Sequence, residues 1–134
     1  LELGSYMGYT TRVLSSIFQK VIAVDASDEF LSRNSQINGD RGNILYVRLH
    51  TRLDELNLLR RNQVHVAMVD AEHDYASVRK DVEDVLEALS PSLQLLIFDD
   101  YATDEGVEKA VQEFIREGKL QMIGGLGLRP PWKY

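Results

Sequence analysis

The chain of 134 residues carries a formal net charge of −6, with 44% hydrophobic and 27% charged residues, a composition typical of one globular domain. The absence of cysteine excludes disulfides, thiolate metal sites and cysteine nucleophiles. There is no basic stripe suited to nucleic-acid phosphates and no apolar run long enough to span a membrane, so we expect neither partner and a cytoplasmic location.

The chain begins at Leu1 with "LELG", which has the pattern of the last turn of a strand whose beginning is missing, so we expect an N-terminally incomplete single domain. Short apolar runs predict further strands, and segments with helical periodicity predict helices between them. The strands are expected at residues 1–3, 21–25, 44–49, 64–70, 93–100 and 119–125, the helices at 9–18, 28–37, 51–61, 75–89 and 104–117, and an edge element at 130–134.

Strands that are apolar on both faces and alternate with helices are typical of a parallel sheet covered on two sides. The sequence therefore predicts a doubly wound α/β fold, with a mostly parallel sheet and helices on both faces. Ligands of such sheets bind at the carboxyl ends of the strands, near the point where strand order reverses. Four aspartates occupy such ends, namely Asp25, Asp70, Asp99 and Asp100. Each alone could be a helix N-cap or loop residue, whereas four on one rim indicate a site.

Residues 4–8, here called the glycine turn, join the first strand to the first helix in the pattern E-x-G-x-x-x-G. Gly4 and Gly8 permit positive φ and a close approach to a ligand, and free amides at a helix start favour a carboxylate or phosphate. A dinucleotide fingerprint, G-x-G-x-x-G, is absent, so we expect a smaller ligand. Asp25 ends the next strand, where a carboxylate can bind ribose hydroxyls, and Ala26 leaves room for a flat base. The pattern predicts an adenosine-type ligand.

The stretches "LELGSYMGYTT" and "VIAVD" resemble the first two cofactor motifs of the class I S-adenosylmethionine-dependent methyltransferases. The resemblance implies one Rossmann-like methyltransferase domain over residues 1–134, with S-adenosyl-L-methionine as cofactor. It places Glu2 near the amino group of the methionine part, Thr10 or Thr11 at its carboxylate, and His50 or Thr51 near adenine. A surface-loop histidine is the alternative for His50. The cofactor-binding residues so implied are Glu2, Gly4, Ser5, Gly8, Thr11, Asp25, Ala26, His50, Thr51 and Asp70.

A second segment, residues 69–114, contains "DAEHDY", "LSP", "DDY" and "GVEKAVQEF". It resembles the metal-dependent O-methyltransferases of the macrocin and sugar group and the related small class I methyltransferases. The resemblance implies that Asp70, Asp99 and Asp100 bind a divalent cation. Three carboxylates on one rim also repel each other unless a proton or cation intervenes, and oxygen ligands without cysteine suit a hard ion such as Mg²⁺.

His73 follows the predicted fourth strand and is a candidate general base, because histidine exchanges protons near neutral pH. Asp70 is the competing candidate, and a solvated loop histidine is the structural alternative for His73. The macrolide-type enzymes usually lack a histidine here, whereas the broader group often has D-x-x-H-x-Y, so the substrate subclass stays open. The helical stripe of Val107, Ala110, Val111 and Phe114 is expected to belong to the core.

The function that these patterns favour is O-methylation of a hydroxyl on a sugar or other small molecule, assisted by a divalent cation. Methylation of a nucleobase or amine is a rival, but "DAEHDY" stands where N/D-P-P-Y/F would be expected. A different class of function is a non-catalytic or degenerate nucleoside-binding module of a larger protein. A homo-oligomer is one way in which a short domain without a lid could complete its substrate cleft.

Overall fold

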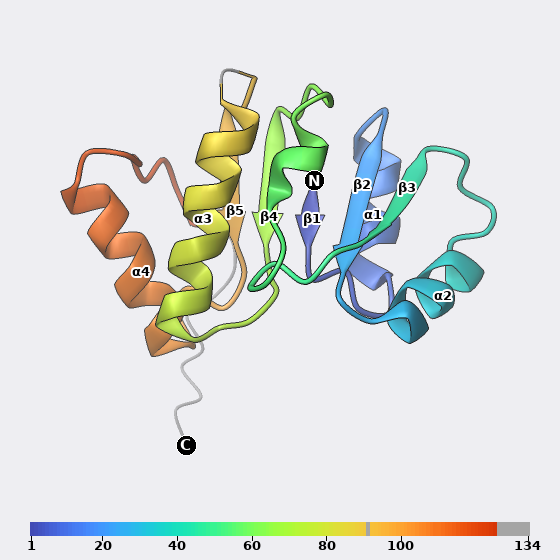
Figure 1. The fold of residues 1–134 in the computed structure, drawn as a ribbon, viewed down its shortest axis with the longest axis horizontal. Helices are drawn as coiled ribbons and strands as arrows, with labels where there is room; N and C mark the ends of the chain where they lie inside the picture. Colours follow the sequence, from blue (N-terminus) through green and yellow to red (C-terminus); the bar gives the residue numbers. More distant parts are fainter. Residues whose placement is uncertain (91, 126–134) are drawn as a thin grey trace.

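The computed structural model describes residues 1–90 and 92–125 and contains one five-stranded sheet whose strand pairs are all parallel (Figure 1). Its elements are β1 (Glu2–Leu3), α1 (Tyr9–Ile17), β2 (Val21–Asp25), α2 (Asp28–Ile37), β3 (Ile44–Arg48), the 3₁₀ helix η1 (Leu56–Leu59), β4 (Val66–Val69), α3 (Tyr75–Leu89), β5 (Leu95–Phe98) and α4 (Glu105–Arg116). The predicted doubly wound α/β fold is confirmed.

The strand order β3-β2-β1-β4-β5 places the short β1 at the centre of the sheet. Leu3 pairs with Val24 of β2 on one side and with Val69 of β4 on the other. Strand order therefore reverses between β1 and β4, and the crevice outside their carboxyl ends is where such sheets bind ligands. The glycine turn leaves β1 at this point.

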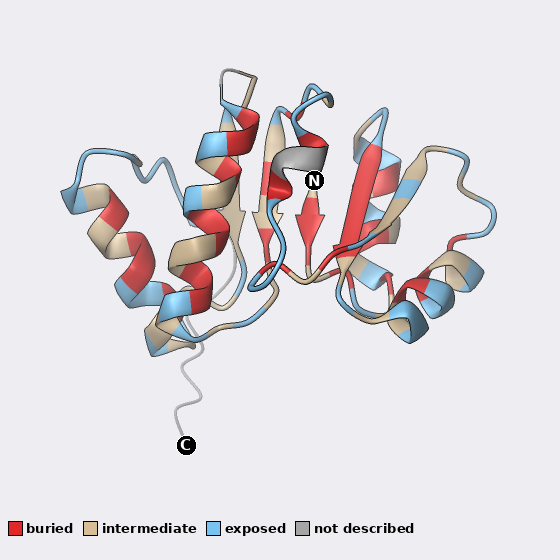
Figure 2. Cartoon of the chain, in the orientation of Figure 1, coloured by how far each residue is buried: buried red, intermediate tan, exposed pale blue. Residues whose placement is uncertain are grey.

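Helices cover the two faces of the sheet in separate groups. Figure 1 shows α3 and η1 in front of the sheet and α1 behind β2, while α4 packs beside α3 at the β5 edge. Buried residues concentrate on β1, β2 and the inward sides of the helices (Figure 2). The stripe predicted on the last helix joins α3 in a buried cluster of Val78, Val82, Val107, Ala110, Val111 and Phe114. Truncating Phe114, which is fully buried, would cost about 3–5 kcal/mol by the usual rule for core aromatics.

Side-chain caps explain why α2, α3 and α4 begin where they do. Ser27 accepts a hydrogen bond from the Phe30 amide at the start of α2. Asp74 and Asp104 do the same for the first turns of α3 and α4. A cap of this kind stabilises a helix by about 1 kcal/mol. The predicted boundaries of α2 and α3 agree with the structure to the residue.

Two predicted elements are wrong. Residues 51–61 form turns and the 3₁₀ helix η1. Leu56 and Leu59 are buried in the core, whereas Leu53, which a continuous helix would have to bury, is 76% exposed. Residues 119–125 form no strand, and Met122 and Ile123 are exposed. An apolar run becomes a strand only where another strand offers it hydrogen bonds. The edge element predicted at 130–134 lies outside the described residues.

Among the helices of the described residues, none has both the length and the apolar character needed to cross a bilayer.

Candidate functional site

The glycine turn lies directly against other parts of the chain. Gly4 and Gly8 have φ values of 84° and 86°. A Cβ on Gly4 would stand 2.1 Å from the carbonyl oxygen of Asp70, and one on Gly8 would stand 2.3 Å from Oδ1 of Asn34. The glycines are therefore required by the approach of the loop after β4 and of α2. The glycine pattern by itself predicts only that the backbone can approach a ligand closely.

Asp25 ends β2 and holds the glycine turn in place. Its Oδ2 accepts a hydrogen bond from the Tyr6 amide at 2.8 Å, and its Oδ1 accepts one from the Ser27 amide at 2.9 Å. Each carboxylate oxygen can accept a further bond. The exposed Tyr6 ring packs edge-on against Phe30, with centroids 4.5 Å apart, and Ala26 is exposed beside them. The end of β2 thus combines a carboxylate with an apolar wall.

A buried polar chain runs beneath the glycine turn. Oγ1 of Thr11 donates to Oε2 of Glu2 at 2.5 Å, and Nδ2 of Asn34 donates to Oγ1 of Thr11 at 2.9 Å. Nδ2 of Asn38 in turn donates to Oδ1 of Asn34. Thr11, predicted to hold the cofactor carboxylate, is fully buried and bound within this chain. Sequence reasoning missed both asparagines, whose only signal is their spacing of four residues at the end of one helix.

Glu2 is fully buried, and its Oε1 has no hydrogen-bond partner among the described residues. Burial raises the pKa of Glu2 to about 7, against the opposing hydrogen bond from Thr11, and the charge of Asp70 raises it further. The hydroxyl of Ser5 in the glycine turn is also buried, and residues 1–90 and 92–125 offer it no hydrogen-bond partner. Two orphaned polar atoms beside the turn fit a polar ligand or water, because buried polar groups are rarely left unpaired.

His50 and Thr51 begin the loop after β3. The Thr51 carbonyl accepts a hydrogen bond from Nζ of Lys80 at 2.8 Å, which fixes the loop to α3. Burial raises the pKa of Asp81, also on α3, to about 6, and the Thr51 hydroxyl opposes that rise. The side chain of Thr51 therefore lies against α3. The backbone amide of His50 donates to Oδ2 of Asp54, and its side chain is half-buried.

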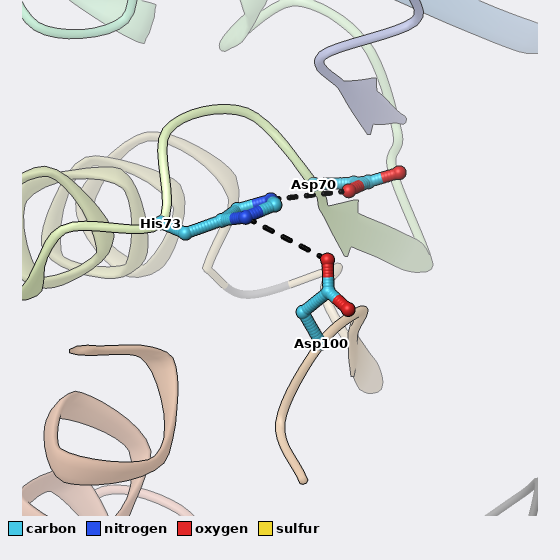
Figure 3. A group of neighbouring side chains, drawn as sticks. All are labelled: Asp70, His73 and Asp100. Atoms are coloured by element: carbon cyan, nitrogen blue, oxygen red, sulfur yellow. Dashed lines mark ion pairs between the residues drawn. The ribbon is translucent and has the colours of Figure 1, made fainter. Parts of the chain in front are cut away.

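Asp70, His73 and Asp100 form a cluster at the ends of β4 and β5 (Figure 3). Nε2 of His73 lies 3.5 Å from Oδ1 of Asp70, and its Nδ1 lies 3.6 Å from Oδ2 of Asp100. One potential ligand atom from each residue lies within 4.8 Å of the others. Asp99 is exposed and does not belong to this group, and its Oδ1 accepts a hydrogen bond from the Asp100 amide.

Backbone geometry explains why the carboxylate of Asp100, and not that of Asp99, belongs to the group with Asp70 and His73. Val69 pairs with Phe98, so Asp70 and Asp99 follow at the same level of the two strands. Asp100 adopts a left-handed φ of 52°, which is uncommon outside glycine, asparagine and aspartate. This turn directs its carboxylate toward His73 (Figure 3). Burial raises the pKa of Asp70, with a further rise from the charge of Asp99 and an opposing hydrogen bond from His73.

Gly106, in the first turn of α4, supports the loop that carries His73. A Cβ at this position would lie 2.3 Å from the His73 carbonyl oxygen and 2.8 Å from the Tyr75 amide nitrogen. Only a residue without a side chain lets α4 come this close to the loop. The sequence gives no sign of this contact, because glycine in a first helical turn is unremarkable by itself.

A family profile described as "Methyltransferase domain" matches residues 1–101, three quarters of the chain. The chain belongs to this methyltransferase family. The family membership agrees with the resemblance of the opening motifs. No significant match was found among curated protein sequences.

Several solved structures share the fold. An rRNA methylase from Streptococcus thermophilus is 19% identical with a TM-score of 0.63, covering 86% of this chain and 66% of its own. Fibrillarin from Aeropyrum pernix, with bound S-adenosyl-L-methionine, is 16% identical with a TM-score of 0.65. The match covers 87% of this chain and 55% of the fibrillarin chain. Phosphoethanolamine N-methyltransferase 1 from Haemonchus contortus, in complex with phosphoethanolamine and S-adenosylhomocysteine, is 24% identical with a TM-score of 0.53. The match covers 65% of this chain and 18% of that enzyme's chain. The chain thus spans between 18% and 66% of the length of these proteins.

Proposed function

We propose that this chain forms the S-adenosyl-L-methionine-binding core of a methyltransferase that methylates a hydroxyl group of a small polar molecule, such as a sugar or glycoside. The observation that carries the proposal is the position of two sites on one sheet edge. The glycine turn with Asp25 lies on one side of the switch point, and the cluster of Asp70, His73 and Asp100 lies on the other. Family membership supports the reaction class.

The first site has the residues that the cofactor needs. Asp25 keeps acceptor capacity for ribose hydroxyls after binding the Tyr6 and Ser27 amides. The orphaned atoms of Glu2 and Ser5 offer partners for the polar methionine part. When bound, S-adenosyl-L-methionine supplies a methyl group that is open to attack by a lone pair. The chain contributes by orienting that methyl group toward the β4 and β5 ends.

The second site has the residues that an acceptor hydroxyl needs. Methyl transfer to an alcohol releases one proton, which Asp70 or His73 is placed to accept. The resemblance of the "DDY" segment assigns a divalent cation such as Mg²⁺ to Asp70, Asp99 and Asp100, and the carboxylates of the cluster fit a cation by charge. A cation bound there would lower the pKa of a neighbouring hydroxyl. The net charge of −6 favours a small acceptor over a nucleic acid.

Calorimetry with S-adenosylhomocysteine and with NAD tests the cofactor assignment. We expect the chain to bind S-adenosylhomocysteine and not NAD. Asp25→Asn should weaken binding of S-adenosylhomocysteine about tenfold or more, because a hydrogen bond to a charged group contributes about 1.5–3 kcal/mol. Asp28→Asn, three residues further on and exposed, is the matched control. Binding of NAD alone would contradict the proposal.

A methyl-transfer screen with labelled cofactor over glycosides and catechols, with and without chelator, tests the acceptor and the cation. We expect labelled product from a hydroxyl acceptor and a loss of rate with chelator. Cofactor binding without transfer to any acceptor would favour a non-catalytic nucleoside-binding module. Transfer that ignores the chelator would remove the cation from the mechanism.

A further inference from the structure

We propose that Asn38, the C-cap residue of α2, is a positioning residue for the cofactor. Its side-chain amide holds the Gly8 carbonyl, so that the Tyr9 amide faces the carboxylate of the methionine part. Asn34, one helical turn earlier, keeps the Asn38 side chain in that orientation. The inference rests on the proposed function and deepens it. It names a main-chain donor for the carboxylate, because the hydroxyl of Thr11 already donates to another group.

The contact between Asn38 and the glycine turn is short and buried. Nδ2 of Asn38 donates to the Gly8 carbonyl oxygen at 2.9 Å, and Asn38 is only 1% exposed. A Cβ on Gly8 would stand 2.7 Å from this nitrogen. A side chain at position 8 would therefore displace the asparagine from the carbonyl.

The polarity of this contact is fixed by groups that can only accept or only donate. The Gly8 carbonyl only accepts, so the nitrogen of Asn38 must face it. On its other side, Oδ1 of Asn38 accepts a hydrogen bond from the guanidinium of Arg12 at 3.4 Å. Nδ2 of Asn38 also donates to Oδ1 of Asn34, whose own Nδ2 donates to Oγ1 of Thr11. These bonds leave Asn38 one orientation, with its donor on the glycine turn.

The Gly8 carbonyl in turn decides where the next amide points. It accepts the Arg12 amide at 3.0 Å as the first bond of α1, and Asn38 occupies its second lone pair. A peptide group is planar and trans, so the Tyr9 N–H points in the opposite direction, out of the start of α1. Loss of the Asn38 donor would leave this carbonyl with one bond and let the peptide tilt.

The start of α1 offers donors to a ligand. α1 begins at Gly8 without a side-chain cap, whereas Asp74 and Asp104 cap α3 and α4. The hydroxyl of Ser5, in the glycine turn, is buried and has no partner among the described residues. A helix start favours a carboxylate, because its N–H groups and the helix dipole attract negative charge. We therefore expect the carboxylate of the methionine part to bind here.

Asn43 provides a matched control for a purely structural role. Its Nδ2 donates to the carbonyl oxygens of Ser15 and Phe18, each at 2.9 Å, at the other end of α1. Asn38 and Asn43 thus make the same kind of bond at the two ends of one helix. Only Asn38 does so beside the glycine turn, so Asn43→Ala should reduce stability without changing which part of the cofactor is bound.

The test compares two ligands by calorimetry. S-adenosylhomocysteine has the carboxylate, and 5′-methylthioadenosine lacks the whole amino-acid part. In Asn38→Ala, we expect the affinity for S-adenosylhomocysteine to fall about tenfold, because a hydrogen bond to a charged group is misdirected. The affinity of Asn38→Ala for 5′-methylthioadenosine, and both affinities of Asn43→Ala, should stay within about twofold of the parent.

A second measurement needs no variant. When the parent chain is titrated and followed by NMR, S-adenosylhomocysteine should shift the Tyr9 amide signal strongly, and 5′-methylthioadenosine should shift it little. The Gly106 amide, which is bound by the cap of α4, is the control and should move with neither ligand. An unmoved Tyr9 amide would overturn the inference even if Asn38→Ala did not fold.

The outcomes separate this inference from the proposed function. Unchanged binding of S-adenosylhomocysteine by Asn38→Ala, equal losses for both ligands, or the same selective loss in Asn43→Ala would overturn the role of Asn38. In each of these cases the parent still binds the cofactor product, so the proposed function stands. A parent chain that binds neither ligand would overturn the proposed function, and the role of Asn38 with it.

Discussion

On the β1 and β2 side of the carboxyl edge, polar side chains are bound to other parts of the chain, whereas on the β4 and β5 side they face one another. Glu2 and Thr11 belong to a buried chain of hydrogen bonds, and Asp25 binds two backbone amides. His73 instead stands half-exposed between two carboxylates. The first side is a hydrogen-bonded framework in which Oε1 of Glu2 and the Ser5 hydroxyl have no partner among the described residues. The second brings the carboxylates of Asp70 and Asp100 together around the imidazole of His73.

Because of this difference, we expect substitutions on the two sides to have different effects. A substitution in the framework damages the fold first, because its groups have structural partners. For a substitution in the cluster, we expect the fold to stay intact and binding or chemistry to be impaired. Stability and binding measured on the same variant therefore separate the two sides.

Gly4→Ala should have the largest effect. Its Cβ would stand 2.1 Å from the Asp70 carbonyl oxygen at a φ of 84°. Overpacking costs about 1–3 kcal/mol and a left-handed alanine about 1–2 kcal/mol, so we expect a loss of about 3 kcal/mol or more in the free energy of unfolding in urea. Gly42→Ala is the control, because no atom lies within 4 Å of its Cβ position and its φ is not positive. Equal stability of the two variants would contradict the close approach.

Glu2 should make the fold less stable as pH rises. Its folded pKa of about 7 exceeds the ordinary value of 4.5, so between these values the folded state holds a proton that the unfolded state releases. Stability attributable to Glu2 is therefore highest below pH 4.5 and falls until about pH 7, by about 3 kcal/mol in total. Glu2→Gln should remove this fall when urea unfolding of both proteins is compared from pH 4 to 8. Parallel pH profiles would show that Glu2 ionises normally.

Gly106→Ala should weaken the cluster from outside it. The added Cβ would press on the His73 carbonyl oxygen, at a cost of about 1–3 kcal/mol in stability. Displacement of the loop should also reduce the affinity for a divalent cation such as Mn²⁺ and shift the NMR signals of the His73 ring. Glu105→Ala, the exposed neighbour in the same helical turn, is the control. An unchanged His73 signal in a destabilised Gly106→Ala protein would deny Gly106 a positioning role.

Tyr6→Ala should have the smallest effect on stability. Its ring is 57% exposed and its contact with Phe30 is edge-on, an interaction that contributes about 0.5–1.5 kcal/mol. If the two rings wall the nucleoside, the affinity for S-adenosylhomocysteine should fall up to about tenfold in calorimetry. Tyr9→Ala, at an exposed position on α1, should bind S-adenosylhomocysteine as the parent does. Equal affinity in Tyr6→Ala and Tyr9→Ala would place the nucleoside elsewhere.

The sequence predicts most of the fold because its signals are local. Ser27 and Asp74 stand at helix starts as N-caps, and the stripe ending at Phe114 has a clear helical period. The wrong helix over residues 51–61 and the wrong strand over 119–125 depend on what packs beside them, which no local pattern records. Apolar residues alone do not specify a partner.

For the site, the sequence predicts which residues lie at the carboxyl edge of the sheet, but not how their side chains are arranged there. The rule that strand ends carry ligands selects Asp25, Asp70 and Asp100. The position of the Asp100 carboxylate beside His73 depends on the left-handed backbone of Asp100, which the rule does not foresee. The roles of Asn34 and Gly106 depend on close approaches between distant segments. Such contacts are properties of the packed chain.

The central claim is that a nucleoside on the β1 and β2 side and an ion on the β4 and β5 side share one sheet edge. Proton relaxation of S-adenosylhomocysteine, bound to the chain with substoichiometric Mn²⁺, measures this directly. We predict strong broadening of the methylene protons beside sulfur and weaker broadening of the adenine protons. Absence of broadening in a ligand that binds, or stronger broadening at adenine, would contradict the account.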